Sequence, residues 1–458
     1  MLSPESANPA HLLIDHALSL RWADIADNAR ARAKTFLHDS LAVGVAGRNA
    51  AHADAVLAIA QGWGRGDDAG VLGRPDVRLP AASAAFVNAF QIHGQEYDCV
   101  HEPAVLHPMA TVLAALLAEA ARGEAVDGER FLTAIVAGVD VAVTLGIAAP
   151  GALKFFRPAT AGIFGCVAAI AALRAMPREQ ALDAFGHALA LVSGTMQAHV
   201  EGKPALPLQV ANAARGSLLA IDLACNGMPG VARPLDGPFG YFALMEEREA
   251  LGPALAQLGQ GHRICEVSWK PFPTGRAGHG GIVAAQQLRE GQGLTADTLE
   301  SFDYHAPPLI HRLVGRPAHG GMEPGYARLC MQYLVAVTLL RGTVSLADFE
   351  QTALNDPDVL ALAERISVIP DGNPDMAAFV PARATVRTRD GSILAQAVTA
   401  QLGSPSWPLT EAQHAAKALA CLTFSGLADV HDALGQAVRG LDREPDALAA
   451  IRRSGIIA

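Results

Sequence analysis

The sequence predicts a mainly α-helical protein: a large helical domain with a smaller α+β domain inserted near its C-terminal end. Segments rich in Ala, Leu and Val fill residues 8–265 and return after residue 404, while aromatic residues make up only 5% of the chain. Tight packing of helices is the usual outcome of such a composition. Between these parts, β-branched segments alternate with turn signals. We therefore place the domain boundaries at 1–265 (helical), 266–403 (α+β) and 404–458 (return to the helical domain).

The first helix is expected to begin at Asn8-Pro9, which combines a cap residue with a proline suited to the first turn. Residues 128–149 contain the longest apolar run, but Asp140 at its centre favours a buried core helix over a membrane span. Many helical segments are apolar on more than one side, which predicts several packed layers. The expected helices cover residues 22–47, 81–94, 107–122, 128–149, 160–174, 178–199 and 208–227.

The α+β domain is predicted from partial alternation of β-branched residues. Turns are signalled at Asp371-Gly372 and Asp390-Gly391. Strands are expected at 299–306, 364–370, 382–389 and 393–400, and helices at 326–340 and 346–354.

Charge and cysteine content exclude several classes of protein. The formal net charge of −10 argues against nucleic acid or an anionic membrane as a partner, because both require basic surface. The six cysteines are dispersed without a C-x-x-C pair, so no zinc or iron–sulfur ligand set is visible. Free thiols and an N-terminus without a signal-peptide pattern predict a cytoplasmic protein.

The most informative segment runs from residue 270 to 281 (KPFPTGRAGHGG). Its Gly and Pro residues fix a non-repeating backbone that carries Lys270, Arg276 and His279. Such a group of cationic side chains suits a small molecule with several carboxylates. The alternative is a surface loop with solvated charges.

A second cluster lies between two apolar helices, at residues 93–107 (HGQEYDCVHEPAVLH). Asp98 and the histidines, among them His101 and His107, could serve acid–base chemistry because histidine titrates near neutrality. Two other interpretations stay open: a metal site built on Asp98, His101 and His107, and a solvated, capped loop.

Two weaker signals involve single basic residues near helix ends. Arg157-Pro158 precedes a helix of small residues whose N-terminal amides would attract an anion, and Lys203 follows Glu201-Gly202 at another helix junction. The sequence lacks the nucleophile elbow, the P-loop and a dinucleotide-binding glycine motif. Serine hydrolase, P-loop and Rossmann functions therefore lose support.

These clusters, in this order, resemble the MmgE/PrpD family, which includes 2-methylcitrate dehydratase, cis-aconitate decarboxylase and iminodisuccinate epimerase. The resemblance runs through residues 33–47, 86–98 with His107-Pro108, 201–216, 269–279, 307–317 and Asp390-Gly391. It implies a helical domain with an α+β lid, usually paired as a homodimer, that works without a metal or an organic cofactor.

The chain departs from the family at two positions. Arg157 stands where the family often has a histidine, and Leu206-Pro207-Leu208-Gln209 replaces a stretch that usually contains a lysine and a histidine. A lysine is available only earlier, at Lys203. Arginine stays protonated and cannot shuttle a proton, although it can clamp a carboxylate. The substrate and the reaction could therefore differ from those of the relatives.

Our sequence-based hypothesis is a cofactor-free lyase that acts on a small di- or tricarboxylic acid through a carbanion next to a carboxylate. Dehydration of a 2-methylcitrate-like acid is the leading reaction, and decarboxylation of the cis-aconitate type and epimerisation are alternatives. Lys270 and Arg276 would stabilise the developing charge and Arg157 would clamp a second carboxylate, while His107 transfers the proton and Asp98 orients it. Further candidates are His101, His279, Lys203 and Tyr326. The rivals are a non-catalytic carboxylate-binding protein and a metal-dependent hydrolase.

Overall fold

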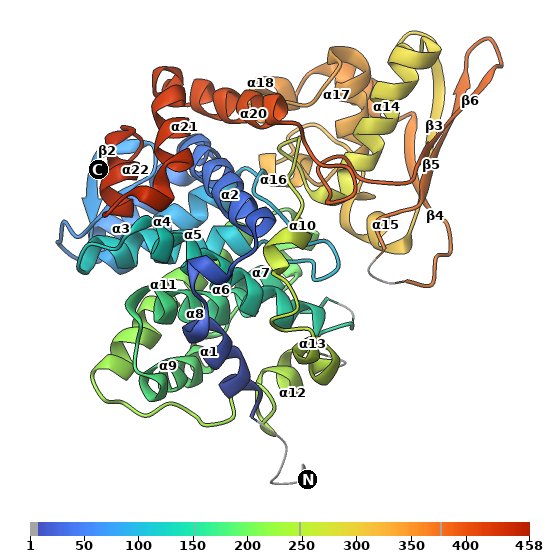
Figure 1. Ribbon diagram of the computed structural model, residues 1–458. Coiled ribbons are helices and arrows are strands. Elements are labelled where there is room, and N and C mark those ends of the chain that lie inside the picture. The colour runs from blue at the N-terminus through green and yellow to red at the C-terminus, as the bar shows by residue number, and fades with distance from the viewer. Residues whose placement is uncertain (1–7, 152, 247–248, 376–377) are drawn as a thin grey trace.

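The computed structural model describes residues 8–151, 153–246, 249–375 and 378–458. The molecule is mainly helical, with a large helical part and a smaller part built around a four-stranded sheet (Figure 1). This agrees with the fold class that the sequence predicts. The exact domain boundaries and the action of the sheet-bearing part as a lid stay predictions.

The helical part contains the following helices up to the sheet: α1 (Pro9–Ser19), α2 (Asp27–Ala46), α3 (Ala53–Gly62), α4 (Ala81–Gly94), α5 (Pro108–Arg122), α6 (Gly128–Ile147), α7 (Arg157–Thr160), α8 (Gly162–Arg174), α9 (Arg178–Leu191), α10 (Gln197–Glu201), α11 (Ala205–Cys225), α12 (Tyr241–Met245) and α13 (Leu251–Ala256). Single 3₁₀ turns lie at η1 (Trp22–Asp24), η2 (Gly47–Asn49), η3 (Arg263–Glu266), η4 (Arg276–Gly278), η5 (Leu346–Phe349), η6 (Ala428–Val430) and η7 (Leu441–Arg443). The start signal at Asn8 is confirmed, because its side chain accepts a hydrogen bond from the Ala10 amide.

The core of this part forms where α4, α5, α6, α8 and α11 pack against one another. Close approach requires small residues: a Cβ atom at Gly138 of α6 would lie only 2.9 Å from the carbonyl oxygen of Gly165 in α8. Helix α6 has the length and apolar composition of a membrane span, but it is largely buried inside the protein. Its central Asp140 accepts a hydrogen bond from the Arg263 amide and pairs with His262. A buried carboxylate requires such partners, because polar groups in a protein core are normally hydrogen-bonded.

Two expectations for the helical part are wrong. It is not entirely helical, because β1 (Ala69–Val71) and β2 (Arg74–Leu79) form an antiparallel hairpin. The Asn88 side chain of α4 holds this hairpin by bonding the Leu72 amide and the Gly70 carbonyl, a contact from a distant segment. The helix expected over 178–199 is also broken between α9 and α10, where Gly194 has a φ of 119°.

The smaller part has one sheet with the strand order β4-β3-β5-β6. Strand β3 (Leu299–Ala306) is parallel to β4 (Ile366–Pro370) and antiparallel to β5 (Ala382–Thr388), which pairs with β6 (Ile393–Val398). All four expected strands are confirmed, with the second beginning two residues later. The accompanying helices are α14 (His279–Gln292), α15 (Pro308–Val314), α16 (Pro324–Ala327), α17 (Met331–Arg341), α18 (Gln351–Leu354) and α19 (Pro357–Ala363).

After the sheet, the chain returns to the helical part through α20 (Glu411–Phe424), α21 (His431–Arg439) and α22 (Ala447–Arg453). Helices α20 and α21, in red, lie beside α2, in blue (Figure 1). Lys417 of α20 fixes this contact, since its Nζ lies 2.7 Å from Asp39 of α2 and donates to the Tyr97 carbonyl at 2.9 Å.

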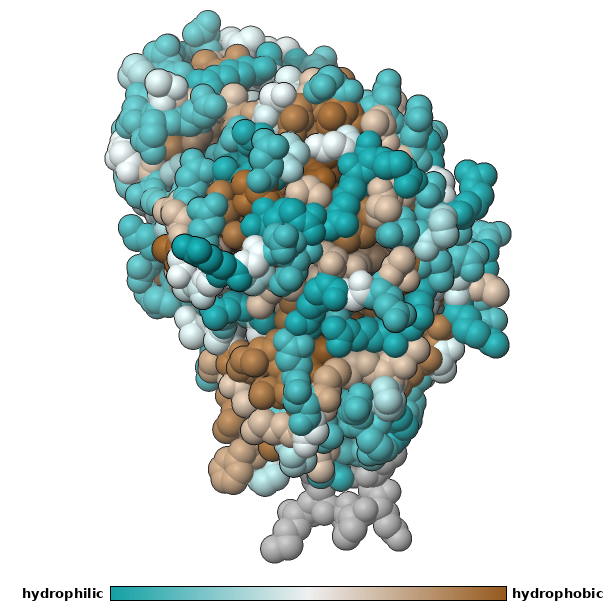
Figure 2. All heavy atoms as spheres, turned by 90° about the vertical axis from the view of Figure 1, so that its left-hand side faces the viewer, coloured by the Kyte–Doolittle hydropathy of each residue, from teal (hydrophilic) through white to brown (hydrophobic). Residues whose placement is uncertain are grey.

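On the face drawn in Figure 2, apolar side chains form several patches that hydrophilic side chains separate. Large apolar residues exposed on the molecule include Val231, Phe239 and Leu244. Because no single continuous apolar area dominates this view, the homodimer stays a prediction.

Candidate active site

The two charged clusters of the sequence lie side by side in the structure. The 93–107 segment joins α4 to α5, and the 270–276 segment leads into α14. Val100 and Ser268 exchange two backbone hydrogen bonds of 3.0 and 2.8 Å, and the Tyr97 hydroxyl donates to the Pro271 carbonyl at 3.1 Å. These contacts place the side chains of both segments in one buried cluster.

Asp98 is the centre of this cluster and is fully buried. Its Oδ2 lies 3.0 Å from Nδ1 of His93 and 3.3 Å from Nδ1 of His107, while Oδ1 lies 3.9 Å from Nζ of Lys270. Lys270 is also fully buried, and its ammonium group donates to both the side chain (2.9 Å) and the carbonyl (3.0 Å) of Glu96. Two carboxylates, one ammonium group and two imidazoles therefore form a compact network.

The network shifts the pKa values of its members. Burial would raise the pKa of Asp98, but His93 and His107 outweigh it and hold this pKa well below its usual range. Burial likewise opposes ionisation of Glu96, yet Lys270 and the two histidines lower its pKa to about 2. Burial alone would lower the pKa of His93, and the charges of Asp98 and Glu96 raise it instead. The network therefore favours ionised carboxylates beside a protonated His93.

His107 is the histidine of the network that lines a neighbouring pocket. Its Nδ1 lies 2.9 Å from the Cys99 carbonyl oxygen, which can only accept, so Nδ1 carries the proton. Nε2 makes no hydrogen bond within the described residues. Burial and the nearby Lys270 lower the pKa of His107, and Asp98 offsets only part of this effect. The neutral imidazole therefore presents an unprotonated Nε2, as a proton acceptor would.

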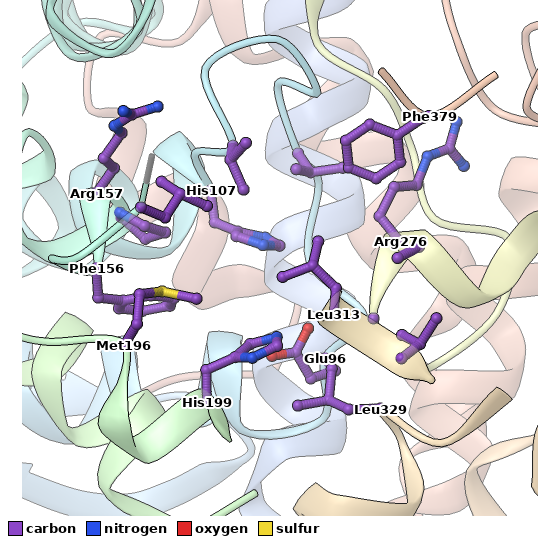
Figure 3. A pocket seen from close by; sticks show the side chains of 17 residues that line it. Glu96, His107, Phe156, Arg157, Met196, His199, Arg276, Leu313, Leu329 and Phe379 are labelled. Atoms are coloured by element: carbon purple, nitrogen blue, oxygen red, sulfur yellow. The ribbon is translucent and has the colours of Figure 1, made fainter. Parts of the chain in front are cut away.

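The pocket beside His107 is narrow and mostly apolar, with a volume of about 50 Å³ (Figure 3). That volume holds a few water molecules, so a larger ligand requires some opening. The lining residues are Glu96, Val100, Val105, His107, Leu153, Phe156, Arg157, Pro158, Met196, His199, Gly275, Arg276, Ala277, Leu313, Val314, Leu329 and Phe379.

The predicted carboxylate clamps line this pocket, but each is bound to an internal carboxylate. Arg157 donates to both carboxylate oxygens of Glu246, at 3.2 and 3.0 Å. Arg276 lies 2.6–2.7 Å from Glu102 and also donates to the Leu402 carbonyl. In Figure 3 both guanidinium groups point away from the middle of the pocket, toward different sides. Their role in binding stays a prediction.

The remaining predicted residues lie outside the network. His101 accepts from the Ala104 amide, and its other nitrogen lies 3.1 Å from Glu266. His279 is fully buried next to Arg276, and burial together with that positive charge holds its pKa well below the usual value. Lys203 lines a second pocket that His93 and Glu96 of the network also line, and the Tyr326 hydroxyl donates to the Pro317 carbonyl.

Two residues that the sequence analysis did not select contribute to the site. His199 lines the pocket opposite His107. Arg328 is buried and donates to the carbonyl oxygens of Gln95 (2.9 Å) and Pro273 (2.7 Å), which ties the 93–107 and 270–276 segments together. Burial lowers the pKa of Arg328 to about 9, against a smaller raising effect of Glu96. His199 begins the weakly indicated helix junction of residues 199–204, in which the sequence analysis selected only Lys203, and Arg328 belongs to no local motif.

A metal ion would find a different set of ligands from the one expected. Side-chain atoms of His93, Asp98 and His107 lie within 4.8 Å of one another, whereas His101 points elsewhere. The hydrogen bond between His93 and Asp98, the contact of His107 with the same carboxylate and the nearby ammonium group of Lys270 suit a proton-transfer network better than a cation site. That the protein works without a metal ion stays a prediction.

Comparisons with known proteins agree with the residue-level resemblance. Residues 12–254 match the MmgE/PrpD N-terminal domain, and residues 272–439 match the MmgE/PrpD C-terminal domain. Cis-aconitate decarboxylase of Mus musculus is 27% identical over 415 residues, which cover 86% of this chain and 82% of that protein. Cis-aconitate decarboxylase of Homo sapiens is 27% identical over 364 residues, or 76% and 74% of the two chains. The chain belongs to the MmgE/PrpD family.

Proposed function

We propose that the protein is a cofactor-free lyase that acts on a small di- or tricarboxylic acid through a carbanion next to a carboxylate. The observation that carries this proposal is His107, whose Nε2 faces the pocket while Nδ1 is fixed by the Cys99 carbonyl and Asp98. An imidazole held in one tautomer at the wall of an apolar pocket is suited to proton transfer at carbon.

The buried positive charge of Lys270 supports the same proposal. A carbanion next to a carboxylate delocalises onto the carboxylate oxygens, and this charge is stabilised by fixed positive groups in a site that excludes water. Lys270 lies beside Glu96, which itself lines the pocket. The ammonium group is therefore one side chain away from the place where a substrate would bind.

Binding of a polycarboxylate requires an exchange of ion pairs. Arg157 and Arg276 line the pocket while Glu246 and Glu102 occupy their guanidinium groups. We propose that substrate carboxylates replace one or both internal carboxylates as the pocket opens. Such an exchange keeps each buried arginine paired with a carboxylate, and a buried arginine without a partner would be costly in free energy. Movement of the α+β part as a lid would provide the opening.

Decarboxylation of a cis-aconitate-like acid is the first reaction to test, because both relatives described above carry that name. In this reaction the bond from carbon to a carboxyl group breaks, carbon dioxide leaves and the carbanion takes one proton, which His107 would donate after its Nε2 has taken up a proton from solvent. Dehydration of a 2-methylcitrate-like acid, the leading expectation from the sequence, uses neutral His107 to remove a proton from carbon before hydroxide leaves. The two reactions share the carbanion and differ in the bond that breaks.

The test is proton NMR in D₂O with cis-aconitate, 2-methylcitrate, citrate, mesaconate, itaconate and iminodisuccinate. We expect deuterium at a carbon next to a carboxylate, and the product identifies the reaction. His107→Ala should slow turnover roughly 10²–10⁴-fold, the usual range for a positioned acid or base. Matched controls are His431→Ala and Lys34→Ala, two residues outside the pocket that should retain activity.

Three results would contradict the proposal. Thermal stabilisation by an acid without exchange or product would support a non-catalytic binding protein. Loss of activity with a chelator, together with stoichiometric bound metal, would support the metal-dependent alternative. Turnover of His107→Ala within about tenfold of wild type would remove this residue from proton transfer.

A further inference from the structure

His199 is placed as a functional side chain would be. It lies on the short helix α10, and its side chain lines the same pocket as His107 with only 8% of the residue exposed. Its carbonyl oxygen accepts from the Arg316 guanidinium at 2.9 Å, which fixes the backbone. Within the described residues, neither ring nitrogen of His199 makes a hydrogen bond. An imidazole on a pocket wall with both ring nitrogens free to bond can be engaged by a ligand in that pocket.

The pocket therefore has an imidazole on each of two facing walls. Figure 3 shows His199 at the lower side of the pocket and His107 at the upper side, with Phe156 and Met196 to the left and Leu313 to the right of the space between them. A ligand that fills this apolar space meets both rings.

The surroundings keep His199 neutral. Burial is the main cause, and the positive charges of Arg316 and Arg312 add to it, while Glu96 opposes them in part. Together they lower the pKa of His199 to about 4. A neutral imidazole still carries one N–H, which it can donate without giving the proton away. Such a donor strengthens as negative charge develops on the oxygen that it faces.

We propose that His199 donates a hydrogen bond to the substrate carboxylate that takes up the carbanion charge, while His107 transfers the proton from the opposite wall. This inference rests on the proposed function and names the donor on which that reaction depends. It gives the pocket a donor for that charge in the structure as it stands, in which the guanidinium group of Arg157 is paired with Glu246. No proton leaves His199, so the step needs no additional reactant.

The experiment compares His199→Ala with His199→Gln and His199→Asn on the acid that the wild type converts. The amide nitrogens of Gln and Asn stand near the positions of Nε2 and Nδ1, so one of them can restore the N–H donor. We expect His199→Ala to lower kcat roughly 10²–10³-fold, as removal of one oxyanion donor does. The better amide variant should recover to within about tenfold of wild type, with KM changed far less than kcat.

Val200→Ala is the matched control, because Val200 is the neighbouring residue of α10 and is 61% exposed. It should keep full activity, which separates the side-chain effect from damage to the helix. Equal losses in all three His199 variants would overturn the donor role, as would His199→Ala with kcat within threefold of wild type. A wild-type protein that converts none of the six acids would overturn the proposed function and this inference with it.

Discussion

Replacement of His199 by glutamine should change how the stability of the protein depends on pH. The pKa of His199 is about 4 in the folded protein, against an ordinary value of 6.5. Between these values the unfolded chain binds the proton and the folded protein does not, so stability falls as the pH falls through this window. Glu96, Arg316, Arg312 and His107 are the charged or titratable groups that act on the ring.

The size of the effect follows from the two pKa values. At pH 4.5 the solution is about two pH units below the pKa of the unfolded chain, so proton binding at this site stabilises the unfolded chain by the free energy of about two pH units. The folded protein gains very little from proton binding over the same range. The difference costs the wild type roughly 2–3 kcal/mol. His199→Gln has no titrating ring and escapes this cost, whereas every other histidine contributes equally to both proteins.

The assay is urea unfolding of both proteins at pH 7.5 and pH 4.5, with the slope m checked for constancy. We expect the stability of His199→Gln relative to wild type to improve by roughly 2–3 kcal/mol as the pH is lowered. A relative stability that stays the same at both pH values within about 0.5 kcal/mol would refute the reasoning, because it would mean that folding does not keep the ring neutral.

Three further predictions concern the network and its surroundings. Asp98→Asn should reduce turnover roughly 10²–10⁴-fold, because the amide no longer provides the charge that orients His107; steady-state rates of the purified variant measure this. Glu102→Gln should lower KM, because the substrate would no longer have to displace a carboxylate from Arg276. Steady-state rates measured over a range of concentrations of the converted acid give KM, and a higher KM would contradict the exchange. Gly202→Ala should lower the thermal midpoint by several degrees in a melting scan, because φ is 65° and the new Cβ would lie 2.6 Å from a neighbouring Cα atom.

The sequence predicted the elements of the fold closely where the signal is local. Start signals such as Asn8-Pro9 and the alternation in 299–306 depend only on neighbouring residues, and the structure confirms both. The hairpin β1–β2 was missed because its pairing depends on Asn88, a residue of the following helix. The break before α10 was missed because an apolar pattern can continue across a single Gly194.

The sequence also identified the segments that carry the site but could not assign their partners. It selected Asp98, His107 and Lys270, and the structure brings these three together. It did not indicate that Arg157 pairs with Glu246, or that His199 lies opposite His107, since these residues are distant in the chain.

The sequence by itself therefore determined most of the long helices, the four strands of the larger sheet and the types of side chain at the site, because periodicity, caps and side-chain chemistry are local properties. Tertiary structure decided which charges are neutralised and which groups face the pocket. Pairing in a buried site depends on distances of a few ångströms between segments that folding brings together, and burial then sets the pKa of each group. Lys270 is an example of both contributions. The sequence shows that this residue carries a positive charge, but only the folded structure shows that the charge lies between Glu96 and Asp98.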